Sequence, residues 1–491
     1  MPFNSLAFLS QFLPLFLAAF WLAGRFGTGR TVATAVVLAA SLVFFQAAGG
    51  WYSLGIGLAS LSLTYLIGSR LCRSDGAGMR RVLFFAGLLS GLLPLIFFKY
   101  KFAFSQSLPG FWADIGMPLA LSFLVFQQVT FLFEMNRDGA VCPRPLDYFA
   151  AVLFFPKLVC GPLTSVCDVA RQIGTSGGQR DARRDLWIGA TYLSLGLFKK
   201  AVLSDPLRPA VDAVYSSLAA GATLPMAEAW TGLLLFFLML YFDFSGYTDI
   251  AIGLARACGI VLPGNFKSPL KACSLADFWS RWHATLTKFL MGVIYNPLAL
   301  WRTRASMRTR PGRLRMFFET AAFPAVVTML VSGIWHGGGW SFIIFGLLHG
   351  LGLTVNQAWR QFKAPRLPAV AGWAATFVFV MVSLIFFRAA DVPTAARMLA
   401  SLAGVGAEGA PRAASLPDWR ILWVAAAAAA IALGLPNSHQ IMGEEKAAPG
   451  ILGGLRWAPT LPWAAGALAC AVCAVALLWR FGSPPFVYSA F

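Results

Sequence analysis

Charged residues are scarce in this chain. Only 12% of its 491 residues are Asp, Glu, Lys or Arg, about half the share in a typical globular protein, whereas 58% are hydrophobic. With so few charges, the folded chain cannot cover itself with a polar surface in water. No hydrophilic stretch is long enough to form a domain. The longest hydrophilic stretches are 165–185, 300–316, 404–417 and 436–456. The sequence therefore predicts a polytopic membrane protein without a separate soluble domain.

Acidic residues are scarcer than basic residues. The chain has 20 of them against 39 Lys and Arg, a net charge of +19. The basic residues stand in short segments between apolar runs, so we expect no nucleic-acid partner. The positive-inside rule explains most of them, with anionic lipid headgroups as further partners. Between Arg302 and Arg315 they are denser than topology requires, and a cytosolic cofactor's phosphates are an alternative partner for Arg302, Arg304, Arg308 and Arg310.

The eight cysteines lack the spacing of a disulfide framework. Cys470 and Cys473 have the spacing of a redox or zinc pair. They lie in an apolar run, however, where small sulfur-containing side chains usually only pack. We therefore predict no metal site and no permanently bound cofactor.

Apolar runs that can cross a hydrocarbon core, about 20 residues as helix, are frequent. They occur near residues 5–23, 32–48, 52–68, 82–98, 114–133, 186–204, 228–242, 318–335, 340–356, 368–387, 418–435 and 460–479. Several are interrupted, so we expect ten to twelve spans. The first run is followed, not preceded, by arginines (Arg25 and Arg30), the reverse of a secretory signal peptide. We expect an uncleaved first helix with its N-terminus outside the cytoplasm.

Carboxylates within apolar sequence are concentrated in one region, residues 228–357. Asp243 and Asp249 lie there in an apolar segment, where a carboxylate must be paired, protonated or turned toward a wet cavity. Four glycines weaken a simple spanning helix, namely Gly246, Gly253, Gly259 and Gly264. We expect broken or re-entrant backbone that lines a cavity.

Histidine occurs only four times, and its placement carries the functional argument. The ordinary pKa of an imidazole lies near neutrality, so an imidazole at membrane depth indicates a buried acid/base site. His283 falls on the apolar stripe of an amphipathic helix expected over 277–295. In that helix Asp277 and Arg281, four residues apart, can pair. We expect His283 to point inward.

His336 stands where an apolar run ends in the glycines of 337–339. Three glycines end a regular helix and allow other atoms close to the backbone, as a site for a long ligand requires. His349 is expected on the following helix, where packing and a helix-to-helix hydrogen bond are the simpler explanation. His439 is expected in a solvated loop. A hydrogen-bonded structural role remains the alternative for His336 and His283.

These residues carry a family resemblance. The chain resembles the membrane-bound O-acyltransferase (MBOAT) family, and within it the bacterial alginate O-acetyltransferase branch. The most specific pieces are DFSGYTDIAIGLARACGIVLPGNFKSP (243–269), DFWSRWHATLTKFL (277–290), IYNPL (294–298) and GIWHGGGWSFIIFGLLHG (333–350). Weaker pieces are FNSLAFL (3–9), FFKYKFAF (97–104), LSFLVFQQVTFLFEMNR (121–137), FFPKLVCGPL (154–163), GLFKKAVLSD (196–205) and FFRAADVPTAARMLASL (386–402). Departures from the pattern are Thr248 in place of Ser, GGGW at 337–340, and EMNR at 134–137.

The resemblance implies the fold and the two catalytic positions. The expected fold is an all-α polytopic MBOAT-type bundle of ten to twelve transmembrane helices, with re-entrant or amphipathic helices around a central channel. We expect one membrane domain over 1–417, its core motifs within 228–357, and a C-terminal transmembrane appendage of the same unit over 418–491. His336 corresponds to the family's catalytic histidine. His283 corresponds to its second polar site residue, which is Asn or His in different branches.

The chemistry of acyl transfer fits these residues. A hydroxyl is a poor nucleophile until a base takes its proton, and a neutral imidazole contributes typically ~10²–10⁴-fold by doing so. We assign this role to His336, with His283 orienting the acyl carbonyl or stabilising its oxyanion. Tryptophans 279, 282, 335 and 340 would exclude water. The residues we expect along the channel are Asp243, Ser245, Asp249, Trp279, Arg281, Trp282, Trp335, Trp340 and His349.

The predicted function is O-acetylation of an exported polysaccharide, alginate-like or another glycan, across the bacterial inner membrane. Acetyl-CoA is the expected cytosolic donor, and transfer is direct or through a periplasmic acetyltransferase-type partner. The N-terminus is expected in the periplasm. The alternatives are a transferase of D-alanyl or longer acyl groups and a polysaccharide or ion transporter. A transporter would use Asp243, Asp249 and the histidines as a proton relay.

Overall fold

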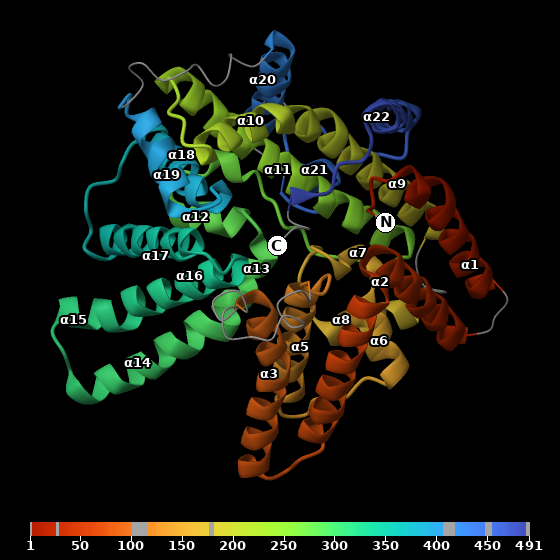
Figure 1. The fold of residues 1–491 in the computed structure, drawn as a ribbon. Helices are drawn as coiled ribbons and strands as arrows, with labels where there is room; N and C mark the ends of the chain where they lie inside the picture. Colours follow the sequence, from red (N-terminus) through yellow and green to blue (C-terminus); the bar gives the residue numbers. More distant parts are fainter. Residues whose placement is uncertain are drawn as a thin grey trace. The chain divides into compact units, whose positions relative to one another are not determined.

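Every regular element that the structure describes is a helix (Figure 1). The computed structural model describes residues 2–25, 29–100, 116–175, 181–405, 418–446 and 454–487. Most of the hydrophilic stretch at 404–417 and part of the motif at 97–104 lie outside these residues. The prediction of an all-α protein is confirmed for the described part of the chain.

Eight of the described helices are long and apolar enough to cross a membrane. They are Arg30–Cys72, Ala77–Tyr100, Ala182–Ala219, Met226–Ala257, Arg313–His336, Trp340–Gln361, Ala369–Arg388 and Leu461–Phe481. Shorter apolar helices cover Phe8–Gly24, Leu121–Met135 and Trp419–Gly434. The chain is therefore a multi-pass membrane protein, as predicted.

The longest helix, α2 (Gly29–Cys72), contains two of the predicted spans. Its 44 residues would measure roughly 66 Å as one straight helix, about twice a hydrocarbon core of about 30 Å. The helix is broken at Gly50, where φ is 72° and ψ is 175°. The break lies between the spans expected at 32–48 and 52–68.

The helices form two compact units that exchange segments along the chain. One unit contains residues 1–198, 246–264 and 458–491, and the other contains 199–245 and 265–457. α20 (Trp419–Gly434) belongs to the second unit and α22 (Leu461–Phe481) to the first. The domain division expected at residue 417 stays a prediction, and residue 417 lies outside the described part.

The first unit is built around the N-terminal helices. Its further elements are η1 (Phe8–Phe12), α1 (Leu13–Arg25), α3 (Ala77–Tyr100), α5 (Leu121–Met135), α6 (Pro145–Leu153), α7 (Phe155–Leu158), α8 (Val166–Thr175) and α9 (Ala182–Phe198). α6 packs on α2 and α8, and α22 packs on α9. The rings of Phe3, Phe8, Phe44 and Phe155 form a buried cluster. Asn4 joins the two ends of the chain through its side-chain N–H, which donates to the Pro484 carbonyl at 3.0 Å.

α11 (Met226–Ala257) corrects the expectation of a broken or re-entrant segment. It is one continuous helix of 32 residues that includes both aspartates. Gly253 does not interrupt it. A Cβ at Gly253 would lie 2.6 Å from the Gly189 carbonyl oxygen and 2.7 Å from the Leu193 nitrogen, both on α9. Gly253 therefore allows the backbones of α11 and α9 to approach closely. The number of glycines in a segment does not show whether they permit such packing or break the helix.

The second unit contains the three histidines of the core motifs. Its helices include α10 (Arg208–Ala219), α12 (Leu275–Arg281), α13 (Ala284–Leu290), α14 (Asn296–Thr309), α15 (Arg313–Phe317), α16 (Phe323–His336), α17 (Trp340–Gln361), α18 (Ala369–Arg388), α19 (Val392–Leu402) and α21 (Ser438–Ile441). α16 and α17 lie side by side (Figure 1), and α17 packs in turn on α12 and α18. This arrangement places His336 and His349 in one packed layer of helices.

The hydrophilic stretch at 300–316 lies at the end of a long helical hairpin. One arm runs through α13, η6 (Met291–Tyr295) and α14, and the other through α15, η7 (Phe318–Ala322) and α16. Glu319 joins the arms, because its carboxylate pairs with Arg302 at 3.2 Å and accepts from the Ser306 hydroxyl at 2.6 Å. We call residues 302–315 the arginine tip. At 1.5 Å per residue, Arg315 lies roughly 30 Å along the second arm from His336.

Gly253→Ala is expected to destabilise the protein by about 1–3 kcal/mol, because the added methyl meets backbone atoms that cannot move aside. The measurement is the midpoint of thermal unfolding of the purified protein in detergent. Gly466→Ala in α22 is the control, since nothing lies within 4 Å of its Cβ position. Equal midpoints for the two variants would contradict the close helix contact.

Candidate functional site

His283 lies at a break between two helices. α12 ends at Arg281, Trp282 is extended, and α13 begins at Ala284. His283 itself has φ 45° and ψ 49°, a left-handed conformation that is uncommon for a residue with a side chain. The expectation of a single amphipathic helix over 277–295 is therefore wrong. The predicted Asp277–Arg281 pair is confirmed, with Nε and Oδ1 2.7 Å apart.

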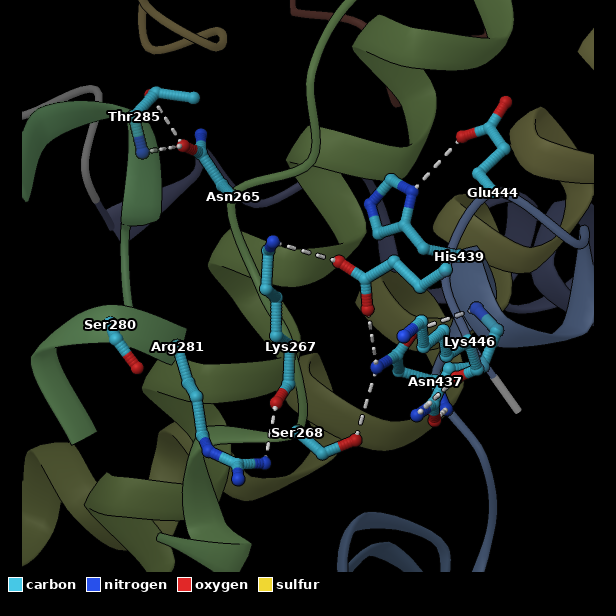
Figure 2. A network of polar contacts seen from close by, with 12 residues as sticks. Asn265, Lys267, Ser268, Ser280, Arg281, Thr285, Asn437, His439, Glu444 and Lys446 are labelled. Carbon is cyan, nitrogen blue, oxygen red and sulfur yellow. Dashed lines mark hydrogen bonds and ion pairs between the residues drawn. The ribbon is translucent and has the colours of Figure 1, made fainter. Parts of the chain in front are cut away.

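Asn265 is the hydrogen-bonding partner of His283. Its side-chain oxygen lies 3.3 Å from Nδ1 of His283 and accepts from the Thr285 hydroxyl at 2.6 Å and the Thr285 N–H at 3.4 Å (Figure 2 shows the Thr285 contacts). Its backbone carbonyl accepts from the N–H of Ala284 at 2.9 Å. Asn265 lies in the motif at 243–269, but its role was not predictable from the sequence, because the contact joins residues 18 positions apart across a loop.

The surroundings of His283 are apolar. The imidazole is 1% exposed, and the Phe244 ring meets it edge-on at 4.8 Å. Burial lowers the pKa of His283 to about 3, because the charged form loses its hydration. His283 is therefore neutral at physiological pH.

His336 is the last residue of α16, directly before the glycine break that the sequence predicted. Its ring is 3% exposed and is surrounded by the rings of Trp335 at 4.5 Å, Phe387 at 5.1 Å and Phe345 at 6.3 Å. A Cβ at Gly337 would lie 2.1 Å from the Phe342 ring, so only glycine fits after His336. The imidazole is thus enclosed by aromatic side chains at the end of a helix.

His349 uses both ring nitrogens to connect helices. Its Nδ1 accepts from the Trp279 indole N–H at 3.2 Å, and its Nε2 lies 2.8 Å from the Ser383 hydroxyl, which donates to the Val380 carbonyl. An indole N–H can only donate, so the proton of His349 is on Nε2. Through these bonds α17 holds α12 and α18, and His349 fixes the position of Trp279.

Aromatic contacts connect the three histidines within this unit. Phe345 lies between His336 and His349, with ring centroids 6.3 Å and 4.5 Å away. From His349 the contacts continue through Trp279 and Phe278 to Trp282, the residue before His283. Of the tryptophans expected to exclude water, Trp279, Trp282 and Trp335 are at most 8% exposed. Trp340 is 73% exposed, so its expected shielding role is wrong.

The carboxylates expected along the channel have other surroundings. Asp243 is fully buried and pairs with Lys200 of η3 (Lys199–Ser204), with Nζ and Oδ1 2.8 Å apart. Lys200 also pairs with Asp205 at 2.6 Å. Ser245 and Asp249 are also buried on α11, where Ser245 belongs to the second unit and Asp249 to the first. Lys200 was not predicted as a site residue, although its apolar sequence neighbourhood is typical of a buried partner for a carboxylate.

The predicted basic residues do not gather around the histidines. Arg281 is partly exposed, where it pairs with Asp277 and donates to the Lys267 carbonyl at 3.3 Å (Figure 2). The four arginines expected to bind cofactor phosphates lie on or directly after α14, at residues 302, 304, 308 and 310. Arg304, Arg308 and Arg310 are exposed there, and Arg302 is half-buried.

His439 corrects the expectation of a solvated loop residue. It is 3% exposed and its Nδ1 lies 3.2 Å from the Glu444 carboxylate (Figure 2). Its segment folds back on the core because Lys267 pairs with Glu445 at 3.3 Å and Asn437 donates to Ser268 at 3.2 Å.

In the described residues, no group of three or more His, Cys, Asp or Glu could hold a metal ion.

Asp243→Ala is expected to lower the free energy of unfolding by about 1.5–3 kcal/mol, because it removes one of the two carboxylates that pair with the buried Lys200 ammonium. The measurement is thermal unfolding in detergent. Asp138→Ala is the matched control, since Asp138 pairs with Arg80 at 2.8 Å but is 97% exposed. An Asp243 variant as stable as this control would show that the buried pair is dispensable.

Comparisons with known proteins show the family of the chain. Residues 119–392, more than half of the chain, match the model of MBOAT, the membrane-bound O-acyltransferase family. The chain is 30% identical over 438 residues to the peptidoglycan O-acetyltransferase of Helicobacter pylori, covering 82% of this chain and 80% of that protein. It is 32% identical over 424 residues to the probable alginate O-acetylase AlgI of Azotobacter vinelandii, covering 83% and 79%.

A more distant similarity covers part of the chain. The teichoic acid D-alanyltransferase of Streptococcus thermophilus is 28% identical over 279 residues, 55% of this chain and 63% of that protein. The resemblance seen in the sequence motifs is thereby confirmed. The chain is an acyltransferase that belongs to the membrane-bound O-acyltransferase family, in the branch of the alginate O-acetylases.

Proposed function

We propose that this protein transfers acetyl groups from acetyl-CoA to the hydroxyl groups of an exported polysaccharide, directly or through a periplasmic partner. The observation that carries the proposal is the buried His336 imidazole, enclosed by aromatic rings at the end of α16. Such a site excludes water, which would otherwise compete with the hydroxyl for the thioester. The long similarities to O-acetyltransferases support acetyl as the transferred group.

His336 acts as the general base in this proposal. Its imidazole takes the proton of the hydroxyl while the hydroxyl oxygen forms a bond to the acyl carbon. The bond between that carbon and sulfur then breaks, and the proton passes to the leaving thiolate. The products are the O-acetyl ester and the free thiol of CoA.

The proposed topology has the donor and the acceptor on opposite faces of the inner membrane. The N-terminus is periplasmic, and the arginine tip is cytosolic by the positive-inside rule. The pantetheine arm of CoA joins the thiol to the phosphates. Extended, it is comparable to four to five extended residues, about 15 Å. It is too short to connect Arg315 with His336, roughly 30 Å away along the second arm of the hairpin. The arginine tip therefore attracts the CoA phosphates at the entrance and does not hold them during transfer.

Transfer of D-alanyl groups is the second candidate. The observation in its favour is the similarity to teichoic acid D-alanyltransferases, at 25–28% identity over 55% of the chain. The similarity to O-acetyltransferases extends over more than 80% of the chain. We therefore favour acetyl transfer.

His336→Ala is expected to leave a folded, inserted protein and to lower acetyl transfer by ~10²–10⁴-fold, because the base is lost. His283→Ala is expected to lose much of the activity as well. The measurement is the acetyl content of the cell's glycans by mass spectrometry, at matched protein levels. His439→Gln is the control, since His439 contacts Glu444 away from the aromatic layer. Near-wild-type acetyl content in the His336→Ala strain would refute the mechanism.

Replacing Arg302, Arg304, Arg308 and Arg310 by Gln is expected to raise the KM for acetyl-CoA, because the positive potential at the entrance falls. The difference from wild type should shrink at high salt, where the potential is screened. A matched control removes four arginines of another short segment, Arg70, Arg73, Arg80 and Arg81. An equal change in KM for both sets, or a change in membrane orientation alone, would assign the arginine tip to topology only.

A further inference from the structure

The orientation of the Asn265 side-chain amide is fixed by its neighbours. Its oxygen accepts from the Thr285 hydroxyl at 2.6 Å and from the Thr285 backbone N–H at 3.4 Å. A backbone N–H can only donate, so the amide atom on this side is the oxygen and not the nitrogen. Thr285 thus determines that the oxygen of the amide, and not its nitrogen, is turned to His283.

The fixed amide determines the tautomer of His283. The same oxygen lies 3.3 Å from Nδ1 of His283, and an amide oxygen can only accept. Nδ1 therefore carries the proton. A neutral imidazole has one N–H, so Nε2 has a lone pair and any group that meets it must bring the hydrogen.

The loop that carries Asn265 is held at both sides (Figure 2). On the side of His283, the Asn265 carbonyl accepts from Ala284 at 2.9 Å, and the Lys267 N–H donates to the Arg281 carbonyl at 3.0 Å. On the other side, Lys267 pairs with Glu445 and Ser268 accepts from Asn437. These bonds maintain the left-handed backbone of His283, a strained conformation of the kind that persists at functional sites.

We propose that Asn265 is a positioning residue of the acyl-transfer site, which holds the proton of His283 on Nδ1 and makes Nε2 a hydrogen-bond acceptor. This inference deepens the proposed function and rests on it. It changes the role expected for His283. A ring whose only N–H is bound to Asn265 cannot donate to a developing oxyanion, so His283 instead orients a substrate O–H or N–H group.

The experiment reads the tautomer directly. The full-length protein with ¹⁵N-labelled histidine is reconstituted in lipid, and the ring nitrogens are recorded by solid-state NMR at neutral pH. The chain has only four histidines, so His283→Asn identifies the signals of His283 by difference. His349 is an internal reference of the opposite tautomer, because Trp279 donates to its Nδ1. We expect His283 with a protonated Nδ1 and His349 with a protonated Nε2.

Variants of Asn265 and Thr285 test the cause. Asn265→Ala is expected to mix the two tautomers of His283 and to lower kcat about 10–100-fold, the usual cost of losing a partner that orients a site residue. Asn265→Asp keeps an accepting oxygen and should restore both the tautomer and most of the kcat. Thr285→Val removes the hydroxyl but keeps the backbone N–H that orients the amide, so we expect it to change the tautomer and the kcat less than Asn265→Ala does.

A protonated Nε2 on His283 in the wild-type protein would overturn the inference, whatever the variants do. An unchanged tautomer in a folded Asn265→Ala protein would overturn it as well. The NMR readout does not depend on the reaction. A protein without acetyl-transfer activity but with the expected tautomer would therefore refute the proposed function and leave only the tautomer assignment of His283 intact.

Discussion

The structure depends on one constraint: a polar group buried in this apolar protein must have a defined partner. Asp243 meets Lys200, His349 meets Trp279 and Ser383, and His283 meets Asn265. Each pairing joins separate segments of the second unit, so the same bonds that neutralise buried polarity also fix the relative positions of its helices. The site residues are thus held by the interactions that make their burial tolerable.

Features encoded over a short stretch of sequence were predictable. The apolar runs became helices of spanning length, and the three glycines after His336 end α16 where the helix was expected to end. Features that depend on a distant partner were not predictable. The apolar spacing at 277–295 indicated one helix, but the break at His283 is maintained by Asn265, which belongs to another segment. His439 looked like a loop residue because the contacts that bury its segment come from Lys267 and Ser268.

Glycine shows why the same residue type supported opposite interpretations. After His336 the helix ends, because Gly337 has an extended backbone with φ −171° and ψ 160°, and a side chain there would meet the Phe342 ring. In α11 it lets a continuous helix approach α9 through backbone contact at Gly253. Both positions have the same residue type in the sequence. The neighbouring helices show whether a glycine ends a helix or allows two helices to pack closely.

The central claim is that an acetyl group passes from cytosolic CoA to a hydroxyl on the far side of the membrane. The most direct measurement uses inside-out vesicles from the native cells, with labelled acetyl-CoA added to the outer, cytosolic face. The account predicts that label appears in the lumen as an alkali-labile ester, and that vesicles from a strain without this chain do not form it. Equal luminal ester in both preparations would contradict the account.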